Sequence, residues 1–266
     1  MPSPRSSAAA SRRVLVVGGG GREHAIAWKL ARDGAEVITA PGNAGTATVG
    51  ENVAIAVTDI PALVELARSR SIDLTVVGPE VPLVAGIVDA FAAAGLRIFG
   101  PTAEAAQLEG SKLFCKQILH RGDVPTAMFR EFRGVGSARD YLRAREDMPV
   151  VIKADGLAAG KGVFVCDDRE AALAAIDSLA ADPSLADATK GILIEERLDG
   201  VEVSVMAVTD GRTIVTLPPL QDHKAAQDGD VGPNTGGLGA YCPTPFVDAG
   251  LLAEIESRIL VPTAHA

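Results

Sequence analysis

Short apolar runs alternate with amphipathic segments along the N-terminal part of the chain. Residues 14–17 form a β-branched and leucine run that ends in glycines, which is typical of a buried strand. Residues 23–32 then bring Ile26 and Leu30 to one face of a predicted helix. The alternation continues with expected strands at 36–40, 73–77 and 97–99, and with expected helices after residue 60 and over 82–94. Strands that alternate with helices predict a parallel sheet covered on both faces.

From residue 102 the pattern changes to a second unit. We expect one long helix over 102–120 and a turn at 122–125, whose glycine, aspartate and proline are typical of a boundary. Further elements are expected downstream, namely strands at 148–154, 162–166, 191–195, 201–208 and 212–217 and an alanine-rich helix at 169–180. A Thr-Asp-Gly hairpin turn at 209–211 makes this half antiparallel. The expected class is α/β, with an extension at 1–12, a parallel-sheet domain at 13–110, a linker helix at 111–122 and further subdomains at 123–190 and 191–266.

Composition and charge narrow the class of protein. The chain has 34 acidic and 25 basic residues and no evident basic patch, so no nucleic-acid partner is expected. Its widely separated cysteines, Cys115, Cys166 and Cys242, argue against a disulfide framework or a zinc site and favour a reducing cytoplasm. No apolar run reaches the about 20 residues of a membrane span, so no membrane partner is expected. We interpret residues 1–12 as a disordered extension in preference to a transit peptide.

A four-glycine turn follows the first expected strand. Residues 18–21 lie where a parallel sheet places its ligands, between the carboxyl end of a strand and the N-terminus of a helix. The spacing is not GxGxxG and no acidic residue ends the second expected strand, which disfavours NAD. Arg22 is a candidate phosphate partner, and a solvated arginine at a helix start is the alternative interpretation.

Two further glycine-rich stretches have charged neighbours. Lys153 and Lys161 flank a linker between two expected strands, and Gly162 stands where a P-loop has Ser or Thr. A hairpin loop that closes over a triphosphate is one interpretation, and a tight turn with exposed lysines is the other. Residues 233–239 follow a run of charged residues and suit a small zwitterion or anion, although ordinary surface loops share this composition.

Eight motifs follow one another along the chain: GGGGREHA, PGNAGT, VVGPEVPLVAG, IFGPTAEAAQLEGSK, VIKADGLAAGKGV, IEERLDGVEVS, QDHK and GPNTGGLGAYCPTP. In this order they resemble the ATP-grasp ligases, and specifically the phosphoribosylamine-glycine ligase (glycinamide ribonucleotide synthetase) family. The resemblance implies a pre-ATP-grasp N-terminal domain followed by an incomplete ATP-grasp fold, with a small lid subdomain at 123–190 and part of the central subdomain at 191–266. It also implies a cytoplasmic, monomeric enzyme of de novo purine biosynthesis that uses ATP and Mg²⁺ or Mn²⁺ to join glycine to 5-phosphoribosylamine through a glycyl phosphate.

The resemblance assigns three groups of site residues. Phosphoribosylamine binding is implied for Gly20, Gly21, Arg22, Asn43 and Glu80. ATP binding is implied for Lys112, Lys153, Gly156, Gly160, Lys161, Gly162, Glu195, Glu196, Leu198 and Glu202, the last on an expected strand that faces the ribose. Glycine binding is implied for Asp222, Lys224, Pro233, Asn234, Thr235, Gly236 and Gly237, and catalysis for Lys153, Asp222, His223 and Lys224. His223 is either a general base or a structural histidine, and an exposed strand glutamate is the alternative for Glu202.

The sequence departs from the family pattern at two places. Ala225 stands where the family usually has an arginine after QDHK, which removes a cation from the expected site. The family's magnesium-binding Glu and Asn are expected beyond Ala266, so the metal ligands are unknown and a C-terminally truncated form is expected. A binding module or inactive remnant therefore stays an alternative, as does another ATP-grasp carboxylate-amine ligase. A nicotinamide oxidoreductase comes last.

Overall fold

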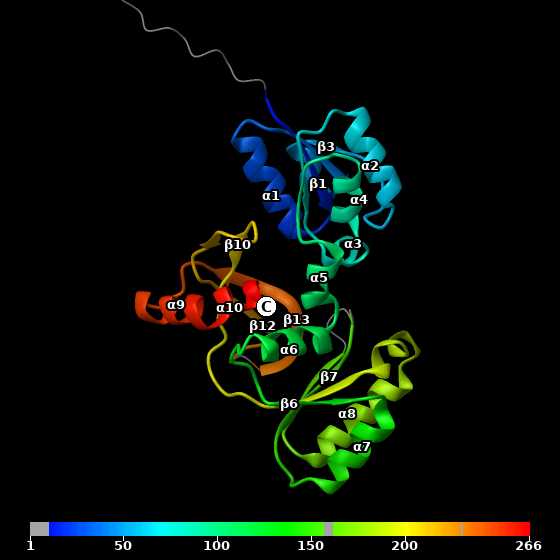
Figure 1. The fold of residues 1–266 in the computed structure, drawn as a ribbon, viewed down its shortest axis with the longest axis vertical. Helices are drawn as coiled ribbons and strands as arrows, with labels where there is room; N and C mark the ends of the chain where they lie inside the picture. The colour runs from blue at the N-terminus through cyan, green and yellow to red at the C-terminus, as the bar shows by residue number, and fades with distance from the viewer. Residues whose placement is uncertain (1–10, 157–161, 230) are drawn as a thin grey trace, which may run out of the picture. The chain divides into compact units, whose positions relative to one another are not determined.

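The computed structural model describes residues 11–156, 162–229 and 231–266 (Figure 1). The chain divides into two compact units, Met1–Gly110 and Ser111–Ala266, and each is described by itself. Within the described residues, no helix is both long enough and apolar enough to cross a membrane.

Unit 1 is built on a five-stranded parallel sheet, as the alternating pattern predicts. Its strands lie in the order β3-β2-β1-β4-β5 and are β1 (Arg13–Gly18), β2 (Glu36–Pro41), β3 (Glu51–Asn52), β4 (Leu74–Val77) and β5 (Ile98–Phe99). Its helices are α1 (Gly21–Arg32), α2 (Ile60–Ser69), α3 (Glu80–Val84), α4 (Ile87–Ala93) and α5 (Ala103–Gly110). A short 3-10 helix spans Thr46–Thr48.

Helices cover both faces of this sheet because side chains alternate along each strand. Leu15 of β1 packs with Phe91 of α4 in the core that also includes α2. Val16 faces the other way and packs with Ala27 of α1. Figure 1 shows α1 on one side of β1 and α2 with α4 on the other. The connecting loops, and not these helices, therefore lie at the carboxyl ends of the strands.

Two long helices expected from the sequence are each divided in the structure. The helix expected at 82–94 is split into α3 and α4 because Gly86 has a φ of +89°, in the left-handed region that interrupts a helix. The helix expected at 102–120 is split into α5 and α6 (Lys112–Arg121). Ser111 separates them with an extended backbone, and its hydroxyl accepts a hydrogen bond from Phe114 N, which caps α6.

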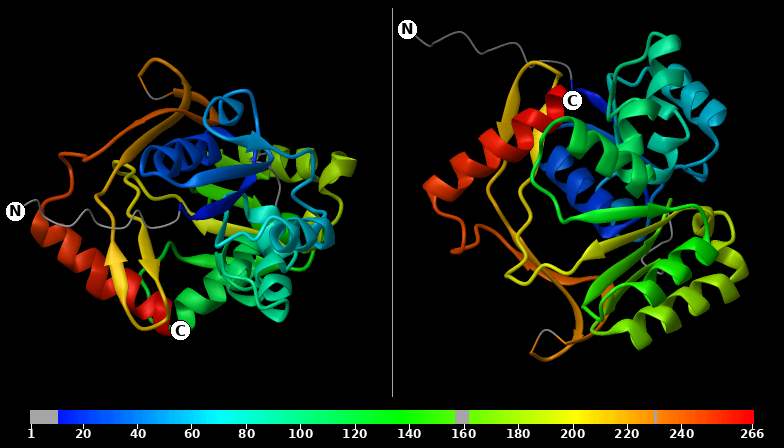
Figure 2. Two further views of the ribbon diagram at one scale, coloured as in Figure 1. Left: turned by 90° about the horizontal axis from the view of Figure 1, so that it is seen from above. Right: turned by 60° about the horizontal axis from the view of Figure 1, so that its bottom comes forward.

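The main sheet of unit 2 is antiparallel and has helices on one face. The strands lie in the order β6-β9-β7-β8 and are β6 (Phe129–Phe132), β7 (Val150–Ala154), β8 (Val163–Cys166) and β9 (Ile192–Glu196). Helices α7 (Val135–Ala144) and α8 (Arg169–Ala181) lie side by side on it (Figure 2). Ile152 and Ile194 point into this helix-covered core, which turns their neighbours Lys153 and Glu195 to the opposite face.

The rest of unit 2 consists of two strand pairs and C-terminal helices. β10 (Ala207–Thr209) pairs with β11 (Ile214–Thr216), and β12 (Gln221–Gln227) pairs with β13 (Val231–Tyr241). Two 3-10 helices span Pro183–Leu185 and Ala188–Lys190, and α9 (Ala249–Ile255), a π-helix (Glu256–Leu260) and α10 (Val261–His265) end the described chain.

Two expectations for this region are wrong. The strand expected at 201–208 is reduced to β10, because Ser204 makes only an isolated bridge to Leu220 and Val201 is 61% exposed with no strand beside it. The loop expected at 233–239 lies within β13 instead. Its glycines suggest a loop when read alone, but pairing with β12 through two register shifts holds the segment extended.

Candidate functional site

The loops of unit 1 that were predicted to bind phosphoribosylamine meet at one edge of the sheet. Gly42 N donates to Gly18 O and Gly78 N donates to Val17 O, so the loops after β1, β2 and β4 are joined at the carboxyl ends of these strands. The strand order reverses direction at β1, which is the switch point where open parallel sheets bind ligands.

A buried carboxylate lies beneath the four-glycine turn. Glu23 is 5% exposed, and its Oε2 accepts a hydrogen bond of 2.6 Å from Gly20 N. A Cβ placed on Gly18, Gly20 or Gly78 would come within 2.5, 2.9 and 2.0 Å of the Glu23 side chain, respectively. These three glycines therefore make room for Glu23, and the Gly20 amide is already used within the protein. Sequence reasoning missed this role, although glutamate at the third helical position was a visible capping signal.

The other residues predicted for this site contact the same turn. Asn43 Nδ2 donates to Gly19 O at 2.9 Å and to Gly20 O at 3.2 Å. Arg22 is exposed, yet its Nη1 donates to Gly78 O at 2.7 Å, so it bridges two loops. A Cβ on Gly21 would have no atom within 4 Å, which identifies the open side of the turn. Glu80 is partly buried in the first turn of α3, two residues after Gly78.

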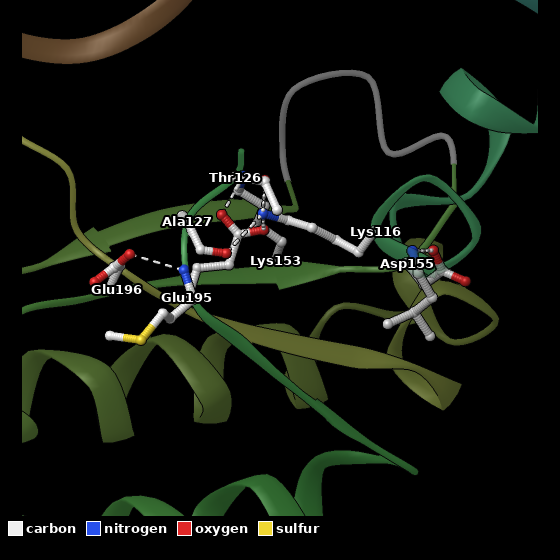
Figure 3. Close-up of polar contacts among 9 residues, drawn as sticks. Lys116, Thr126, Ala127, Lys153, Asp155, Glu195 and Glu196 are labelled. Carbon is white, nitrogen blue, oxygen red and sulfur yellow. Dashed lines mark hydrogen bonds and ion pairs between the residues drawn. The ribbon is translucent and has the colours of Figure 1, made fainter. Parts of the chain in front are cut away.

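In unit 2, two lysines converge on one buried glutamate (Figure 3). Glu195 of β9 is 5% exposed, and its Oε2 lies 2.8 Å from Lys153 Nζ of β7. Lys153 is paired in register with Leu193, so it lies diagonally across from Glu195 on one face of the sheet. Lys116 of α6 approaches Glu195 Oε1 at 3.3 Å. The sequence interpretation included Glu195 in the segment that reads adenine; the structure shows its carboxylate between two ammonium groups.

The start of α6 is tied to the loop that follows β7. Asp155 Oδ1 accepts hydrogen bonds from Ser111 Oγ at 3.0 Å and from Leu113 N at 3.2 Å. Lys112 Nζ donates to Gly156 O at 2.9 Å. Gly162 O, at the other end of this loop, accepts from Ala154 N. Gly160 and Lys161, predicted to bind ATP, lie outside the described residues.

The segment after Glu195 holds the next predicted ATP contacts. Glu196 exchanges two hydrogen bonds with Met128: its backbone N donates to Met128 O at 2.9 Å, and its Oε1 accepts from Met128 N at 2.8 Å. Leu198 follows the end of β9 and is 68% exposed. The two hydrogen bonds with Met128 thus fix the backbone at Glu196, while the side chain of Leu198 presents an apolar surface.

The three adjacent residues predicted for catalysis on β12 are separated by the alternation of the strand. Lys224 lies 3.7 Å from Asp222 Oδ1 and forms an ion pair with Glu202. The hydrogen bond that Lys224 donates to Glu202 raises the pKa of Lys224 above its usual value, despite partial burial that acts in the opposite direction. His223 lies on the other face and stacks on Tyr241. Glu202 lies outside any strand, so the expected strand position is wrong, and its carboxylate forms an ion pair with Lys224.

The predicted glycine-binding stretch forms part of the strand opposite these residues. Pro233, Asn234, Thr235, Gly236 and Gly237 belong to β13, and Asn234 is in register with Ala225. Gly237 has a φ of +108°, and its amide donates to Thr235 Oγ1 at 3.1 Å. The hairpin therefore places the predicted stretch opposite Ala225, while Asp222 pairs with Ala240, beyond that stretch.

A magnesium site cannot be assembled from the described parts of the chain. Among them no group of three His, Cys, Asp or Glu side chains is arranged to hold a metal ion. Asp222 and Glu202 share Lys224, so their charge is balanced by an ammonium group. We therefore assign no metal ligands and derive no step through a metal.

Comparison with known proteins places this geometry in a family. The family described as "Phosphoribosylglycinamide synthetase, N domain" matches residues 12–109, and "Phosphoribosylglycinamide synthetase, ATP-grasp (A) domain" matches residues 110–266. The phosphoribosylamine–glycine ligase of Rhodopirellula baltica is 56% identical over 92% of this chain and 58% of its own length. The crystal structure of the Thermotoga maritima phosphoribosylamine–glycine ligase is 34% identical with a TM-score of 0.76, covering 95% of this chain and 60% of that one.

A more distant structure shares only the fold. The biotin carboxylase domain of the Hydrogenobacter thermophilus 2-oxoglutarate carboxylase, solved with MgADP and bicarbonate, is 16% identical with a TM-score of 0.67 over 95% of this chain and 57% of that one. The two family matches define an ATP-grasp protein with an N-terminal α/β domain. More specifically, the chain belongs to the phosphoribosylglycinamide synthetase family. It spans about 58% of the length of the curated relatives it matches.

Proposed function

We propose that this chain takes part in the ATP-dependent ligation of glycine to 5-phosphoribosylamine, which yields glycinamide ribonucleotide, ADP and phosphate. The observation that carries the proposal is the 56% identity to the Rhodopirellula baltica ligase across both units, with the predicted site residues present. We infer that unit 1 binds phosphoribosylamine, and that unit 2 binds ATP and glycine. A cytoplasmic location and a monomeric state belong to the same proposal.

The proposed reaction has two substitution steps. A glycine carboxylate oxygen attacks the γ-phosphorus of ATP, and the bond to the β–γ bridging oxygen breaks to release ADP. The amine of 5-phosphoribosylamine then attacks the acyl carbon of glycyl phosphate, the acyl C–O bond breaks, phosphate leaves and the nitrogen loses a proton. The protein contributes mainly by orienting the reactants and by stabilising the spreading negative charge. In this family proposal Mg²⁺ or Mn²⁺, when bound, neutralises nucleotide phosphate charge.

Cationic side chains of unit 2 are arranged for the nucleotide role. The Lys153 side chain is 28% exposed although its Nζ contacts Glu195, so it is the more open partner of this ion pair. Lys112 is held near the end of β7 by the hydrogen bond that its Nζ donates to Gly156 O. Both are positioned by protein contacts before a ligand arrives, which lowers the entropy lost on binding. We assign both to the ATP phosphates, and Asp222 with Lys224 to the glycine side.

In unit 1, the open side of the turn at Gly21 and the guanidinium of Arg22 support a phosphate site for the sugar substrate. His223 faces away from Asp222 and Lys224 and stacks on Tyr241, which supports a structural role over that of general base.

The proposal is tested by measuring ADP release with ATP, Mg²⁺, glycine and 5-phosphoribosylamine, and with each acceptor substrate omitted in turn. Release that depends on both acceptors supports the ligase. ATP binding without such release supports the alternative of a binding module, and turnover with other acceptors supports a different ATP-grasp ligase.

Two variants separate the sites. Lys153→Met should weaken ATP binding about tenfold or more and leave phosphoribosylamine binding unchanged, as expected for loss of a charge-assisted contact. Arg22→Ala should do the reverse. Lys190→Met is the matched control for charge, because this lysine is exposed and pairs with Asp187. Equal loss of both ligands in Lys153→Met would contradict the division of roles.

A further inference from the structure

Lys116 is a buried charged group to which the proposed reaction gives no role. Its side chain is 10% exposed, and it extends from α6 into the interior of unit 2 (Figure 3). Burying an ammonium group costs several kcal/mol unless the charge is paired and hydrogen-bonded. If the residue at this position only filled the core, an apolar side chain would stabilise the fold more than a lysine.

The surroundings of Lys116 compensate the buried charge. Nζ donates to Thr126 Oγ1 at 2.6 Å and to Ala127 O at 3.2 Å. It lies 3.3 Å from Glu195 Oε1 and 5.2 Å from the centre of the Phe129 ring. Glu195 Oε1 is buried and accepts no hydrogen bond from the described residues, among which the nearby Lys116 ammonium group provides its electrostatic compensation. Lys116 is therefore fixed at one oxygen of Glu195.

Lys153 is fixed at the other oxygen of the same carboxylate, at 2.8 Å. The three charges in direct contact, two positive and one negative, sum to +1. The Lys116 side chain is 10% exposed and the Lys153 side chain 28%, so the Lys153 end of the cluster is the more open end. Without Lys116, Glu195 would neutralise Lys153 and the sum would be zero.

We propose that Lys116 is a positioning residue that balances Glu195, so that Lys153 keeps its positive charge available for the nucleotide phosphates. Helix geometry supports this role, because Lys112 and Lys116 are one turn apart on the same face of α6. That face therefore supplies one lysine to the loop at Gly156 and a second to Glu195. The inference rests on the proposed ATP site and adds to it a residue that does not touch the nucleotide.

The test compares ATP with adenosine, because only ATP carries the phosphate charge. Displacement of the fluorescent probe TNP-ATP from the 266-residue chain gives the dissociation constant of each ligand. The dissociation constant of adenosine divided by that of ATP measures how much the phosphates contribute to binding. In Lys116→Met this ratio should fall on the order of tenfold. That is the effect expected from removing one unit charge about 10 Å from the nucleotide phosphates at an effective dielectric constant of about 20. Lys116→Arg should keep most of the ratio.

Charge balance also predicts a rescue that a packing role would not give. Glu195→Gln raises the local sum to +2, and Lys116→Met with Glu195→Gln returns it to +1. The double variant should therefore recover a ratio near that of the unaltered chain, although it carries one more change than Lys116→Met. Thr126→Val is the matched control: it removes the shortest hydrogen bond of Lys116 but no charge, and should change the ratio less than about twofold.

The outcomes separate the two proposals. No ATP binding by the unaltered chain contradicts the ATP site itself, and with it the role of Lys116. ATP binding with an unchanged ratio in Lys116→Met overturns the role of Lys116 alone, as does a double variant worse than the single one. Should Lys116→Met not fold, the comparison of Glu195→Gln with the double variant still isolates the Lys116 charge. Equal ratios in those two variants would overturn the inference.

Discussion

Gly78 should not tolerate alanine, because its hydrogen side faces the buried side chain of Glu23. A Cβ at this position would lie 2.0 Å from Glu23 Oε1 and 2.5 Å from both Cγ and Cδ of that side chain. No unstrained contact is that short, so Glu23 must move away. We therefore predict that Gly78→Ala displaces the buried carboxylate and destabilises unit 1.

The magnitude follows from what Glu23 loses. Its hydrogen bond with Gly20 N, 2.6 Å long, is charge-assisted, and such bonds contribute about 1.5–3 kcal/mol. Replacing glycine by alanine returns about 0.4–1 kcal/mol through the unfolded state, and Gly78 is not among the positive-φ glycines, so no backbone strain is added. The net loss should be about 0.5–2.6 kcal/mol in the free energy of unfolding.

Gly21→Ala is the matched control within the same site. Its Cβ would meet no atom within 4 Å, and it occupies the first position of α1, so the change should be neutral or stabilising by up to about 1 kcal/mol. Urea unfolding of each variant gives the comparison. In a Glu23→Ala background, Gly78→Ala should lose most of its cost. Equal stability of Gly78→Ala and Gly21→Ala, or an unchanged cost without Glu23, would refute the packing argument.

Three further predictions concern unit 2. Asp155→Ala should cost about 2–3 kcal/mol in urea unfolding, because two donors of the α6 start lose their acceptor, whereas Asp168→Ala removes one helix cap and should cost about 1 kcal/mol. Burial raises the pKa of the Cys166 thiol, so iodoacetamide at pH 8 should label exposed Cys242 first by mass spectrometry. The pKa of Lys224 is raised by its glutamate partner, so the stabilisation lost in Lys224→Met should be constant below about pH 10 and should vanish as the pH rises through the raised pKa.

Much of the fold could be predicted from the sequence because the signals were local. The run at residues 14–17 and the helical face of Ile26 gave β1 and α1, and the repeated alternation gave a parallel sheet. The predicted helix boundaries were wrong where the backbone conformation of a single residue ends a helix, as at Gly86 and Ser111. The segment 233–239 was misjudged for a different reason: β13 is glycine-rich, and its pairing with β12, the strand just before it in the chain, holds it extended.

The candidate site was predictable as a list of residues and less so as an arrangement. Lys153 stood out beside a glycine-rich loop, whereas Lys116 looked like any charged residue of an amphipathic helix. Only the packing of α6 near β9 reveals that Lys116 contacts a buried carboxylate. Glu23 was hidden similarly, because its significance depends on Gly78, which is distant in sequence and adjacent in space.

The two concealed residues, Glu23 and Lys116, share a physical logic. Each is a buried charge near residues that are proposed to bind phosphate. Glu23 contacts the Gly20 amide in unit 1, and Lys116 contacts the buried Glu195, which in turn contacts Lys153, in unit 2. A phosphate site needs donors and cations that are held in place before the ligand arrives. Glycine loops and exposed lysines cannot provide that order by themselves, because they are the most mobile groups available. The buried charges supply it, which explains why an apolar residue, although cheaper to bury, would not serve at either position.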